Sequence, residues 1–390
     1  MSLAQGLEAA PQRKLRRENR LSQRILIVGS GFFGAVCARE LTDAGNSVLV
    51  LEEREHIGGN CFTRFVPEAD CHQHIYGPHI FHTNDPSVWA YVNRFVEFNN
   101  FVNRPRVNYR GGLYSFPINL FTMYQVFGVK TPEEARARIE QERVPIEKPN
   151  SLEEWCLSQI GPTLYRMFIQ GYTVKQWQTD PRKLPASIIR RLPVRFTFDD
   201  NHFRDRYQGI PIGGYTQIFG RLLDGVPVEC GVNFLEDRDR WLNRYDHVIY
   251  TGALDRFFDF EYGDLEYRSL RFDSELVPLN DFQGNAIINY TEAEVPYTRI
   301  VEHKHFDQSL SASKTLVTRE YSVTWNRRLI PYYPINTEEN QERYRRYRDE
   351  LKKLELPMSI GGRLAEYRYY DMHQVVAGAL KLSASLLRSD

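Results

Sequence analysis

The sequence predicts an α/β protein in which a parallel-sheet domain, assembled from separate stretches of chain, is interrupted by a helical insert and an antiparallel β-sheet domain. Three observations predict this architecture. A strand–helix–strand pattern with a glycine-rich turn occupies residues 25–52. Glu, Arg and Gln interleaved with Leu and Ile predict helices across Thr131–Leu192. A stretch rich in Tyr, Phe, Thr and Val predicts antiparallel strands across Phe260–Tyr333.

The N-terminal pattern begins with Ile25–Val28, a continuous apolar run of the kind expected for a buried parallel strand. The run ends in Gly29-Ser30-Gly31-Phe32-Phe33-Gly34, and a predicted helix over Ala35–Leu41 and a second strand over Ser47–Leu51 follow. In such a unit the first glycine allows a tight turn, the second lets backbone approach a pyrophosphate, and the third permits close helix packing. Glu52 stands where a carboxylate accepts hydrogen bonds from a ribose hydroxyl. We therefore predict a Rossmann-like dinucleotide-binding domain.

Later segments are expected to complete this domain and to add the other two. Tyr245–Gly252 predicts another apolar strand, Asn340–Leu354 predicts an amphipathic helix, and a final helix is expected from about His373. The expected boundaries are 24–100, 205–255 and 340–390 for the discontinuous dinucleotide-binding domain, 115–200 for a helical insert with a mobile substrate loop, and 101–114 with 256–339 for an antiparallel sheet substrate domain.

Charge and composition exclude some classes of partner. The 390 residues carry 50 Lys plus Arg and 50 Asp plus Glu, whereas a nucleic-acid or anionic-membrane binder would usually show a basic excess. Basic residues do cluster in residues 1–23, which we interpret as a disordered extension or an expression remnant rather than a nucleic-acid-binding arm. Five scattered cysteines indicate reduced thiols, and no apolar stretch approaches the ~20 residues of a membrane helix. We expect a cytoplasmic protein without membrane insertion.

Two further glycine segments indicate which dinucleotide the domain would bind. His56-Ile57-Gly58-Gly59-Asn60 follows the second strand, and a glycine pair there, which gives the backbone a second close approach, is typical of FAD proteins. Val248-Ile249-Tyr250-Thr251-Gly252 and Gly361-Gly362-Arg363 match other segments of the same fold. The sequence thus resembles the glutathione-reductase-like FAD fold, and FAD is favoured over NAD.

Six longer stretches of sequence restrict the resemblance to one family within this fold. They are Gly77-Pro78-His79-Ile80-Phe81-His82-Thr83-Asn84, Gly171-Tyr172-Thr173-Val174-Lys175-Gln176-Trp177, Pro193-Val194-Arg195-Phe196-Thr197-Phe198, Val295-Pro296-Tyr297-Thr298-Arg299-Ile300, Pro331-Tyr332-Tyr333-Pro334 and Gly361-Gly362-Arg363-Leu364-Ala365-Glu366-Tyr367-Arg368-Tyr369-Tyr370-Asp371. Together they resemble the bacterial UDP-galactopyranose mutase family, from the first strand to the C-terminal helix. The resemblance implies an isomerase, a flavoenzyme that interconverts UDP-galactopyranose and UDP-galactofuranose for cell wall biogenesis with no net redox change.

The resemblance also implies how the reaction proceeds. N5 of reduced FAD attacks the anomeric carbon and expels UDP, and the covalent flavin–galactose adduct opens, recloses on the other hydroxyl and takes UDP back. The sequence offers no G-x-S-x-G elbow and no cysteine in a marked basic setting, which leaves the covalent work to the cofactor. The main alternative is an amine-oxidase-like or protoporphyrinogen-oxidase-like FAD oxidoreductase. A third interpretation is a nucleotide-sugar sensor without catalysis.

A set of site residues follows from the resemblance. Arg191 and Arg299 would clamp the diphosphate, because a planar guanidinium contacts phosphate oxygens in bidentate fashion while it stays charged. With His82, which would respond to the redox state of the flavin, they are the expected catalytic residues. The expected substrate-binding residues are Asn103, Phe168, Tyr172, Trp177, Arg191, His202, Arg268, Arg299, Tyr333 and Tyr369. The expected cofactor-binding residues are Gly29, Gly31, Phe32, Phe33, Gly34, Glu52, Gly58, Gly59, Asn60, His79, Gly362, Arg363, Tyr370, Asp371 and Met372.

Two positions depart from the family pattern. His202 stands where a phosphate-contacting tyrosine is expected, and Gln178 stands where glycine often follows the loop tryptophan, Trp177. The four histidines within 72–82, beside Cys71, fit no metal-ligand spacing, so we expect no metal. UDP-galactose is the expected substrate, nucleic acid is not expected as a partner, and a homodimer or higher homo-oligomer is expected.

Overall fold

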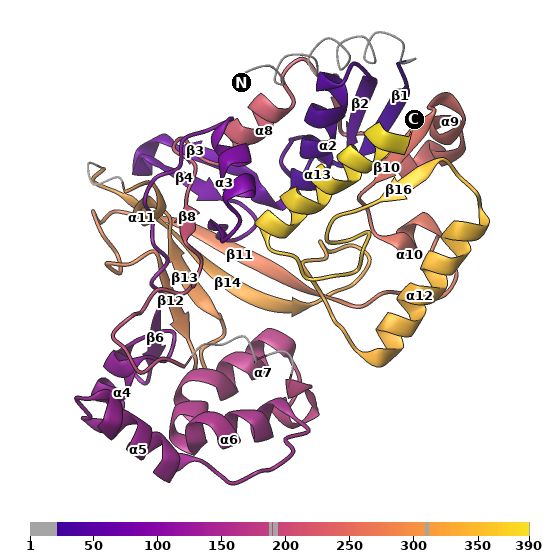
Figure 1. Ribbon diagram of the computed structural model, residues 1–390. Helices are drawn as coiled ribbons and strands as arrows, with labels where there is room; N and C mark the ends of the chain where they lie inside the picture. Colours follow the sequence, from indigo (N-terminus) through magenta and orange to yellow (C-terminus); the bar gives the residue numbers. More distant parts are fainter. Residues whose placement is uncertain (1–21, 187–188, 190–193, 309–311, 390) are drawn as a thin grey trace, which may run out of the picture.

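Figure 1 shows the computed structural model, which describes residues 22–186, 189, 194–308 and 312–389. Arg191 and all but the last two residues of the expected N-terminal extension lie outside the described residues. Two large sheets organise the described chain: a parallel sheet in the upper part of Figure 1 and an antiparallel sheet in the middle, with a helical lobe at the bottom. The predicted α/β fold class is confirmed.

The parallel sheet has the order β16-β10-β1-β2-β9, and every neighbouring pair is parallel. Its strands are β1 (Arg24–Val28), β2 (Ser47–Glu52), β9 (Val228–Cys230), β10 (His247–Tyr250) and β16 (Met358–Ile360). Helix α2 (Phe32–Asp43) follows β1 and begins three residues earlier than predicted, because Gly31 with extended backbone is already its N-cap. Strand β16 was not predicted.

Alternate residues of β1 separate two cores, as expected where both faces of a parallel sheet are covered. Ile25 and Ile27 belong to one core, with side chains of α2, α8 (Thr216–Leu222) and the C-terminal helix α13 (Met372–Ser389). Leu26 belongs to the other, with side chains of α9 (Arg238–Arg244), α10 (Leu254–Phe257) and α12 (Glu338–Lys353). Helices α2 and α13 lie side by side (Figure 1), which brings the last helix of the chain to the glycine turn.

The antiparallel sheet has the order β15-β11-β14-β13-β12-β6-β7, in which only the β12–β6 pair is parallel. Its strands are β6 (Arg106–Tyr109), β7 (Gly112–Ser115), β11 (Tyr267–Val277), β12 (Ile287–Tyr290), β13 (Arg299–Glu302), β14 (Thr315–Thr324) and β15 (Tyr333–Pro334). The pairing of β13 with β14 sets Arg299 opposite Glu320. A cationic and an anionic side chain are thus neighbours across two strands of this sheet.

The helical lobe at the bottom of Figure 1 contains α4 (Leu120–Phe127), α5 (Pro132–Glu142), α6 (Leu152–Leu164) and α7 (Gly171–Trp177). A π-helical turn, Tyr165–Gln170, joins α6 to α7. Local signals start these helices: the Thr131 hydroxyl accepts from the Glu134 amide, and the Glu134 carboxylate accepts from the Thr131 amide, a capping box at the start of α5. Buried Leu152, Ile160 and Leu164 then line the core of the lobe.

Smaller elements connect these parts. Two short antiparallel sheets pair β3 (Thr63–Val66) with β4 (Cys71–His74) and β5 (Phe81–Thr83) with β8 (Tyr207–Gly209). Further helices are α3 (Pro86–Asn93) and α11 (Lys304–Asp307), with short turns at Gly59–Cys61, Pro67–Ala69, Pro181–Lys183 and Phe234–Asp237. The domain boundaries expected from the sequence stay a prediction.

Candidate functional site

The glycine turn between β1 and α2 allows close backbone approach. Gly29 has φ +103°, and a Cβ there would lie 2.2 Å from Oγ1 of Thr251. A Cβ on Gly34 would lie 1.9 Å from the carbonyl oxygen of Gly29, so the third glycine lets helix and turn touch. A Cβ on Gly31 would meet nothing within 4 Å, and no side chain of the described residues caps α2 there. The first amides of this helix are therefore accessible to a ligand, an arrangement that suits phosphate.

The second glycine segment touches the first. Gly58 has φ +95° and its amide donates to Oγ of Ser30 at 3.2 Å, while a Cβ on Gly59 would lie 3.3 Å from Cα of Gly31. Glu52 at the end of β2 is buried, and it accepts from the amide and the hydroxyl of Ser30 at 2.9 and 2.6 Å. The predicted ribose-binding carboxylate is thus held beside both glycine segments.

The third glycine segment and the start of α13 close the same region. A Cβ on Gly361 would lie 1.9 Å from the ring of Phe33, and Gly362 has φ +89°. The sulfur of Met372, the first residue of α13, lies 3.6 Å from the thiol of Cys61, which directly follows the second glycine segment. Three distant stretches that were predicted to bind FAD therefore meet in space.

Arg54 is a candidate cofactor ligand that no sequence pattern indicated. Its guanidinium lies over the ring of Tyr76, 4.3 Å from the centroid, and donates to Oδ1 of Asn60 at 2.8 Å. Its Nη1 is buried and has no hydrogen-bond partner among the described residues. A buried unpaired guanidinium nitrogen is unfavourable until an anion completes its hydrogen bonds. Together with the glycine segments, Arg54 and Asn60 form a donor set that fits the diphosphate of FAD.

Arg299, which is partly exposed, and the buried Glu320 form an ion pair. Nε and Nη2 of Arg299 donate to the same oxygen of Glu320 at 2.9 and 2.8 Å, and the Glu320 side chain is 1% exposed. Burial acts to lower the pKa of Arg299, but the Glu320 carboxylate outweighs burial and the net shift is upward. The Arg299 guanidinium therefore stays charged.

Three predicted substrate residues gather around this ion pair. The rings of Tyr333 and Tyr369 stack with their centroids 5.7 Å apart, and Arg363 lies over the ring of Tyr369 at 5.0 Å. Burial raises the pKa of Tyr172 and of Tyr333, and the charges of the ion pair act on both hydroxyls. Both phenols therefore remain neutral hydrogen-bond donors beside a cation, which suits an anionic ligand.

His202 and Asn103, two predicted substrate residues, are neighbours. The amide of His202 donates to the carbonyl oxygen of Asn103 at 2.8 Å, and Asn103 is buried. Nδ1 of His202 is buried and has no hydrogen-bond partner among the described residues. Burial, helped by the charges of His82 and Arg299, lowers the pKa of His202 to about 4. The imidazole is therefore neutral near pH 7, and a nearby anion would favour its protonation.

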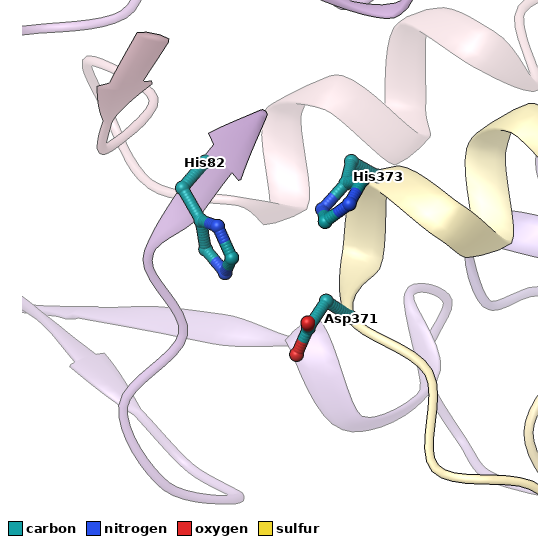
Figure 2. Close-up of side chains that lie close together, drawn as sticks. All are labelled: His82, Asp371 and His373. Carbon is teal, nitrogen blue, oxygen red and sulfur yellow. The ribbon is translucent and has the colours of Figure 1, made fainter. Parts of the chain in front are cut away.

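His82 lies where the predicted flavin-side and substrate residues meet. His82, Asp371 and His373 each place one side-chain nitrogen or oxygen within 4.8 Å of the others, and both imidazoles and the carboxylate border the same space (Figure 2). Nδ1 of His82 donates a hydrogen bond to Asp205. His79, the other predicted flavin-side histidine, directs Nδ1 at the carbonyl oxygen of its neighbour Gly77 at 2.8 Å, and burial lowers its pKa to about 4.

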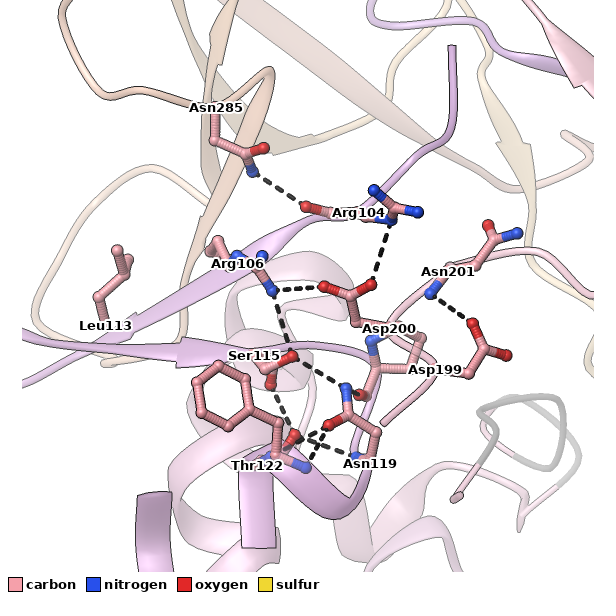
Figure 3. Close-up of polar contacts among 12 residues, drawn as sticks. Arg104, Arg106, Leu113, Ser115, Asn119, Thr122, Asp199, Asp200, Asn201 and Asn285 are labelled. Carbon is pink, nitrogen blue, oxygen red and sulfur yellow. Dashed lines mark hydrogen bonds and ion pairs between the residues drawn. The ribbon is translucent and has the colours of Figure 1, made fainter. Parts of the chain in front are cut away.

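A polar cluster anchors the segment 194–206, here termed the returning segment, which follows the helical lobe in the chain and reaches His82 through Phe203 and Asp205. Figure 3 shows this cluster. Asp200 accepts from Nη1 of Arg106 on β6 at 2.9 Å and pairs with Arg104 at 3.2 Å. Arg106 also donates to the hydroxyl of Ser115 on β7 at 3.1 Å. The returning segment is thereby fixed to β6, and Arg106 links it in turn to β7.

Arg268 and Trp177 mark where α7 ends against the antiparallel sheet. Arg268 is buried, and it donates to the carbonyl oxygen of Gln176 and to the hydroxyl of Ser322, both at 3.0 Å. The Ser322 hydroxyl donates to the same carbonyl oxygen at 2.7 Å. The structure thus gives Arg268 a role in holding α7, and its predicted contact with substrate stays a prediction.

Gln178, which occupies the expected glycine position, adopts the left-handed conformation that glycine favours, with φ +49°. Its Nε2 donates to the carbonyl oxygen of Ser322 at 3.1 Å, and its Oε1 accepts from the hydroxyl of Thr324. These contacts of Gln178 with Ser322 and Thr324, here termed the Gln178 latch, tie the residue after α7 to β14.

Phe168 packs inside the helical lobe. Its side chain is 2% exposed, stacks on Phe116 with the centroids 6.3 Å apart, and meets Tyr114 edge-on at 5.8 Å. It lies in the π-helical turn, which changes the angle between residues four apart, so the single helical face expected for Phe168 and Tyr172 is interrupted. The base-stacking role of Phe168 stays a prediction.

Two groups of His, Asp and Glu side chains among the described residues are close enough to share one small ligand. The first is His82, Asp371 and His373, and the second is Asp281, Glu302 and His305. In the second group the oxygens of Glu302 already accept from Thr315 and from two backbone amides. The expectation that the chain needs no metal stays a prediction.

Sequence comparison relates this chain to known proteins. Residues 27–95 match the model of an NAD(P)-binding Rossmann-like domain, and residues 167–369 match the family model of UDP-galactopyranose mutase. A probable UDP-galactopyranose mutase from Klebsiella pneumoniae is 42% identical over 373 residues, which cover 94% of this chain and 96% of that protein. The chain belongs to the UDP-galactopyranose mutase family.

This membership confirms the resemblance drawn from the strings of the sequence. A dTDP-fucopyranose mutase from Escherichia coli is also similar, at 37% identity over 94% of this chain and 99% of that protein. A crystal structure of reduced UDP-galactopyranose mutase has a TM-score of 0.71 at 16% identity and covers 95% of this chain and 96% of that one, so the fold of the family is shared. In the part of this family member that the structure describes, no helix is both long and apolar enough to cross a bilayer.

Proposed function

We propose that this chain interconverts UDP-galactopyranose and UDP-galactofuranose while FAD is bound in its reduced form. Family membership supports a mutase. The observation that carries the choice of a nucleoside diphosphate sugar is the largely shielded Arg299–Glu320 pair with tyrosine hydroxyls gathered around it. A fixed cation and neutral phenols together would match the charge and the acceptor oxygens of a diphosphate.

In this proposal the chain's own residues hold the departing UDP. A diphosphate gains negative charge as its bond to the sugar breaks, so a fixed guanidinium stabilises that stage more than the starting complex. Arg299 suits this task because two of its nitrogens are already fixed by Glu320 and need no reorganisation. Arg191, outside the described residues, would be the second arginine, and Asn103, Phe168, Trp177 and His202 would enclose the rest of the substrate.

The same proposal places FAD against the three glycine segments. The amides of α2 and the Arg54 guanidinium would bind its diphosphate, and Glu52 would bind its ribose. His79, Arg363 and the start of α13 would lie near its ring system. When bound and reduced, FAD would supply the nucleophilic nitrogen for a covalent route through the anomeric carbon of galactose.

One assay tests this function. Protein reduced with dithionite should convert UDP-galactofuranose to UDP-galactopyranose, measured by chromatography, and protein kept oxidised should not. A FAD oxidoreductase would produce no isomer, and a nucleotide-sugar sensor would bind the substrate without conversion. The proposal fails if the reduced protein produces no UDP-galactopyranose, or if the oxidised protein is equally active.

The dTDP-fucopyranose mutase relative supplies a second candidate substrate. Galactose and fucose differ at C6, and UDP and dTDP differ at the base methyl and the ribose 2′-hydroxyl. A substrate pocket would therefore distinguish UDP-galactose from dTDP-fucose at three positions. We favour UDP-galactose because both the family model and the 42% identical relative carry that name. A higher kcat/KM with dTDP-fucofuranose than with UDP-galactofuranose would reverse this choice.

We also propose that the protein is a cytoplasmic homodimer or higher homo-oligomer that supplies galactofuranose for cell wall biogenesis. Light scattering at assay concentration would measure the oligomeric state. A monomer that is fully active would remove the oligomer from the proposal and leave the reaction unaffected.

A further inference from the structure

His82 is held by a carboxylate at its Nδ1. His82 is the middle residue of β5, and β5 pairs with β8 so that His82 lies opposite Gln208. Asp205 comes just before β8, and its carboxylate reaches back across the pair to accept a hydrogen bond from Nδ1. The two side chains are 11% and 20% exposed, so the pair is largely shielded from water. Shielding strengthens a charge-assisted hydrogen bond.

Further contacts fix both partners. The second oxygen of Asp205 accepts from Nδ2 of Asn84, and Oδ1 of Asn84 accepts from the amide of Arg206 at 2.9 Å. The imidazole of His82 stacks on Phe203, with centroids 3.7 Å apart and an angle of 13° between the rings. With Nδ1 bonded and one ring face covered, the orientation of His82 is determined. Nε2 is its other polar atom.

Titratable groups from two other elements face His82. From α13, the His373 ring lies with its centroid 5.2 Å from that of His82, and its Nδ1 is buried without a hydrogen-bond partner among the described residues. Asp371, just before α13, borders the same space (Figure 2). From the returning segment, His202 lies close enough for the charge of His82 to act on it. The imidazole is thus surrounded by groups that bind or release protons.

We propose that Asp205 is the positioning residue of His82 in the mutase reaction: it keeps a proton on Nδ1 and so makes Nε2 the proton-exchanging atom. This inference rests on the proposed function. When a pyranose becomes a furanose, the ring oxygen gains a proton as the ring opens, and the C4 hydroxyl loses one as the new ring closes. His82 enters this step as the imidazolium: Nε2 gives its proton to the ring oxygen, and the neutral ring that remains, still protonated on Nδ1, takes one proton from the C4 hydroxyl, so the exchange balances and consumes no co-reactant. A carboxylate on Nδ1 that sets the tautomer of a histidine base is well established in hydrolases.

A second carboxylate–histidine pair provides a matched control. Nδ1 of His72 on β4 lies 3.1 Å from Oδ2 of Asp307 on α11, and these side chains are 19% and 14% exposed. The pair has similar chemistry and burial, and neither residue belongs to the proposed site. Asp307→Ala therefore measures what the loss of such a pair does to the protein in general.

The test compares Asp205→Ala, Asp205→Glu and Asp307→Ala as FAD-loaded, reduced enzymes. Asp205→Ala should lower kcat about 10²-fold, the lower end of general acid–base contributions. Its KM for UDP-galactofuranose and its affinity for UDP should stay unchanged, because the Asp205 carboxylate bonds to His82 and Asn84 and to no predicted nucleotide ligand within the described part of the chain. Asp205→Glu should recover part of kcat, and Asp307→Ala should match the wild type. Where Asp205→Ala does not retain FAD, Asp205→Asn, which keeps the volume, replaces it.

Histidine ¹⁵N NMR of the oxidised holoenzyme provides a readout that does not depend on activity. The His82 signals should report a proton on Nδ1 in the wild type and in Asp307→Ala, and a shift toward Nε2 protonation in Asp205→Ala. Wild-type kcat in Asp205→Ala, unchanged His82 signals, or a parallel loss of UDP affinity would each overturn the proposal. If the wild type shows no mutase turnover, the proposed function fails, and the NMR result still decides whether Asp205 sets the tautomer of His82.

Discussion

Two nitrogens of Arg299 donate to one oxygen of Glu320. The orientation of the Arg299 guanidinium toward the proposed substrate is therefore set by a carboxylate that would not itself contact substrate. Replacing Glu320 by Gln leaves a partly buried guanidinium without its counter-charge, which lowers the free energy of unfolding by about 1–3 kcal/mol, less than for a fully buried pair. We also expect turnover to fall about 10²-fold, since a misdirected charge contact stabilises the departing diphosphate poorly. Urea unfolding and the chromatographic assay measure the two effects.

Glu275→Gln is the matched control for this substitution. Glu275 pairs with Arg319 at 2.9 Å across β11 and β14, but its side chain is 57% exposed. An exposed pair contributes little, so stability and turnover should stay close to wild type. Wild-type turnover in Glu320→Gln would show that Arg299 acts without its partner.

The His202 imidazole should take up a proton when UDP binds. Its pKa in the free protein is about 4, so the ring is neutral at pH 6 to 7, and a diphosphate beside it would raise that pKa toward the working range. Proton uptake on binding means that affinity rises as pH falls. Calorimetry in buffers with different ionisation enthalpies gives the number of protons taken up. His202→Gln should reduce this number, and the difference between the proteins separates His202 from the titration of UDP itself. Equal uptake by both would place His202 away from the phosphates.

At the scale of the element, the Gln178 latch decides how firmly the end of α7 is held. Gln178→Gly removes both side-chain hydrogen bonds and relieves the unfavourable left-handed conformation, so overall stability should change little while the end of the helix loosens. Hydrogen exchange of the Gln178 amide, which donates to Val174 at 2.7 Å, should become faster. Thr324→Val should reproduce much of this effect from the sheet side. Unchanged hydrogen exchange in both variants would show that the Gln178 latch does not stabilise the end of α7.

Elements with a local signal could be predicted, and elements defined by distant partners could not. Strand β1, the glycine turn and β2 each carry their own pattern, and they form within one residue of the predicted strand ends. Strand β16 has three residues and no alternation, and only its pairing with β10 makes it a strand. The π-helical turn likewise has no sequence signal that separates it from an α-helix.

The same distinction applies to the candidate site. The glycine segments and the family strings indicated which residues to expect there. The partners that orient them, Glu320 for Arg299 and Asp205 for His82, are brought close by strand register and strand pairing, which residue types alone do not reveal. In the sequence, nothing distinguishes Arg54 from any other residue that follows a strand. Its candidate role is visible only in the structure, where its Nη1 has no hydrogen-bond partner among the described residues.

At the scale of the whole molecule, several buried histidines predict acid sensitivity. The amide of His79 donates to Nδ1 of His74 at 3.1 Å, and the amide of His74 donates to Nδ1 of His303 at 3.2 Å, so the Nδ1 atoms of His74 and His303 must be unprotonated acceptors. Burial lowers the pKa to about 4 for His79, to about 3 for His303, and well below the usual value for His74.

The sign of the effect follows from the unfolded state, where histidine titrates near 6.5. Below that pH the unfolded chain binds protons that these histidines do not bind in the folded protein. Their contribution to the free energy of unfolding is therefore constant above pH 7 and falls steadily toward pH 4. Urea unfolding at pH 7, 6 and 5 measures the slope. His303→Asn, which keeps an acceptor for the His74 amide, should make the slope shallower. A slope unchanged by this substitution would contradict the assignment to His303.

The strand order of the parallel sheet has a consequence for synthesis on the ribosome. β1 pairs early with β2, but its other neighbour, β10, begins only at His247, and α13 is the last helix of the chain. A growing chain therefore exposes one unpaired edge of its first strand for much of translation. The contacts of α13 with Cys61 and the glycine segments form only once residues 372–389 have been synthesised. We expect cofactor capture to wait for α13, and chains that terminate before α13 to accumulate without flavin.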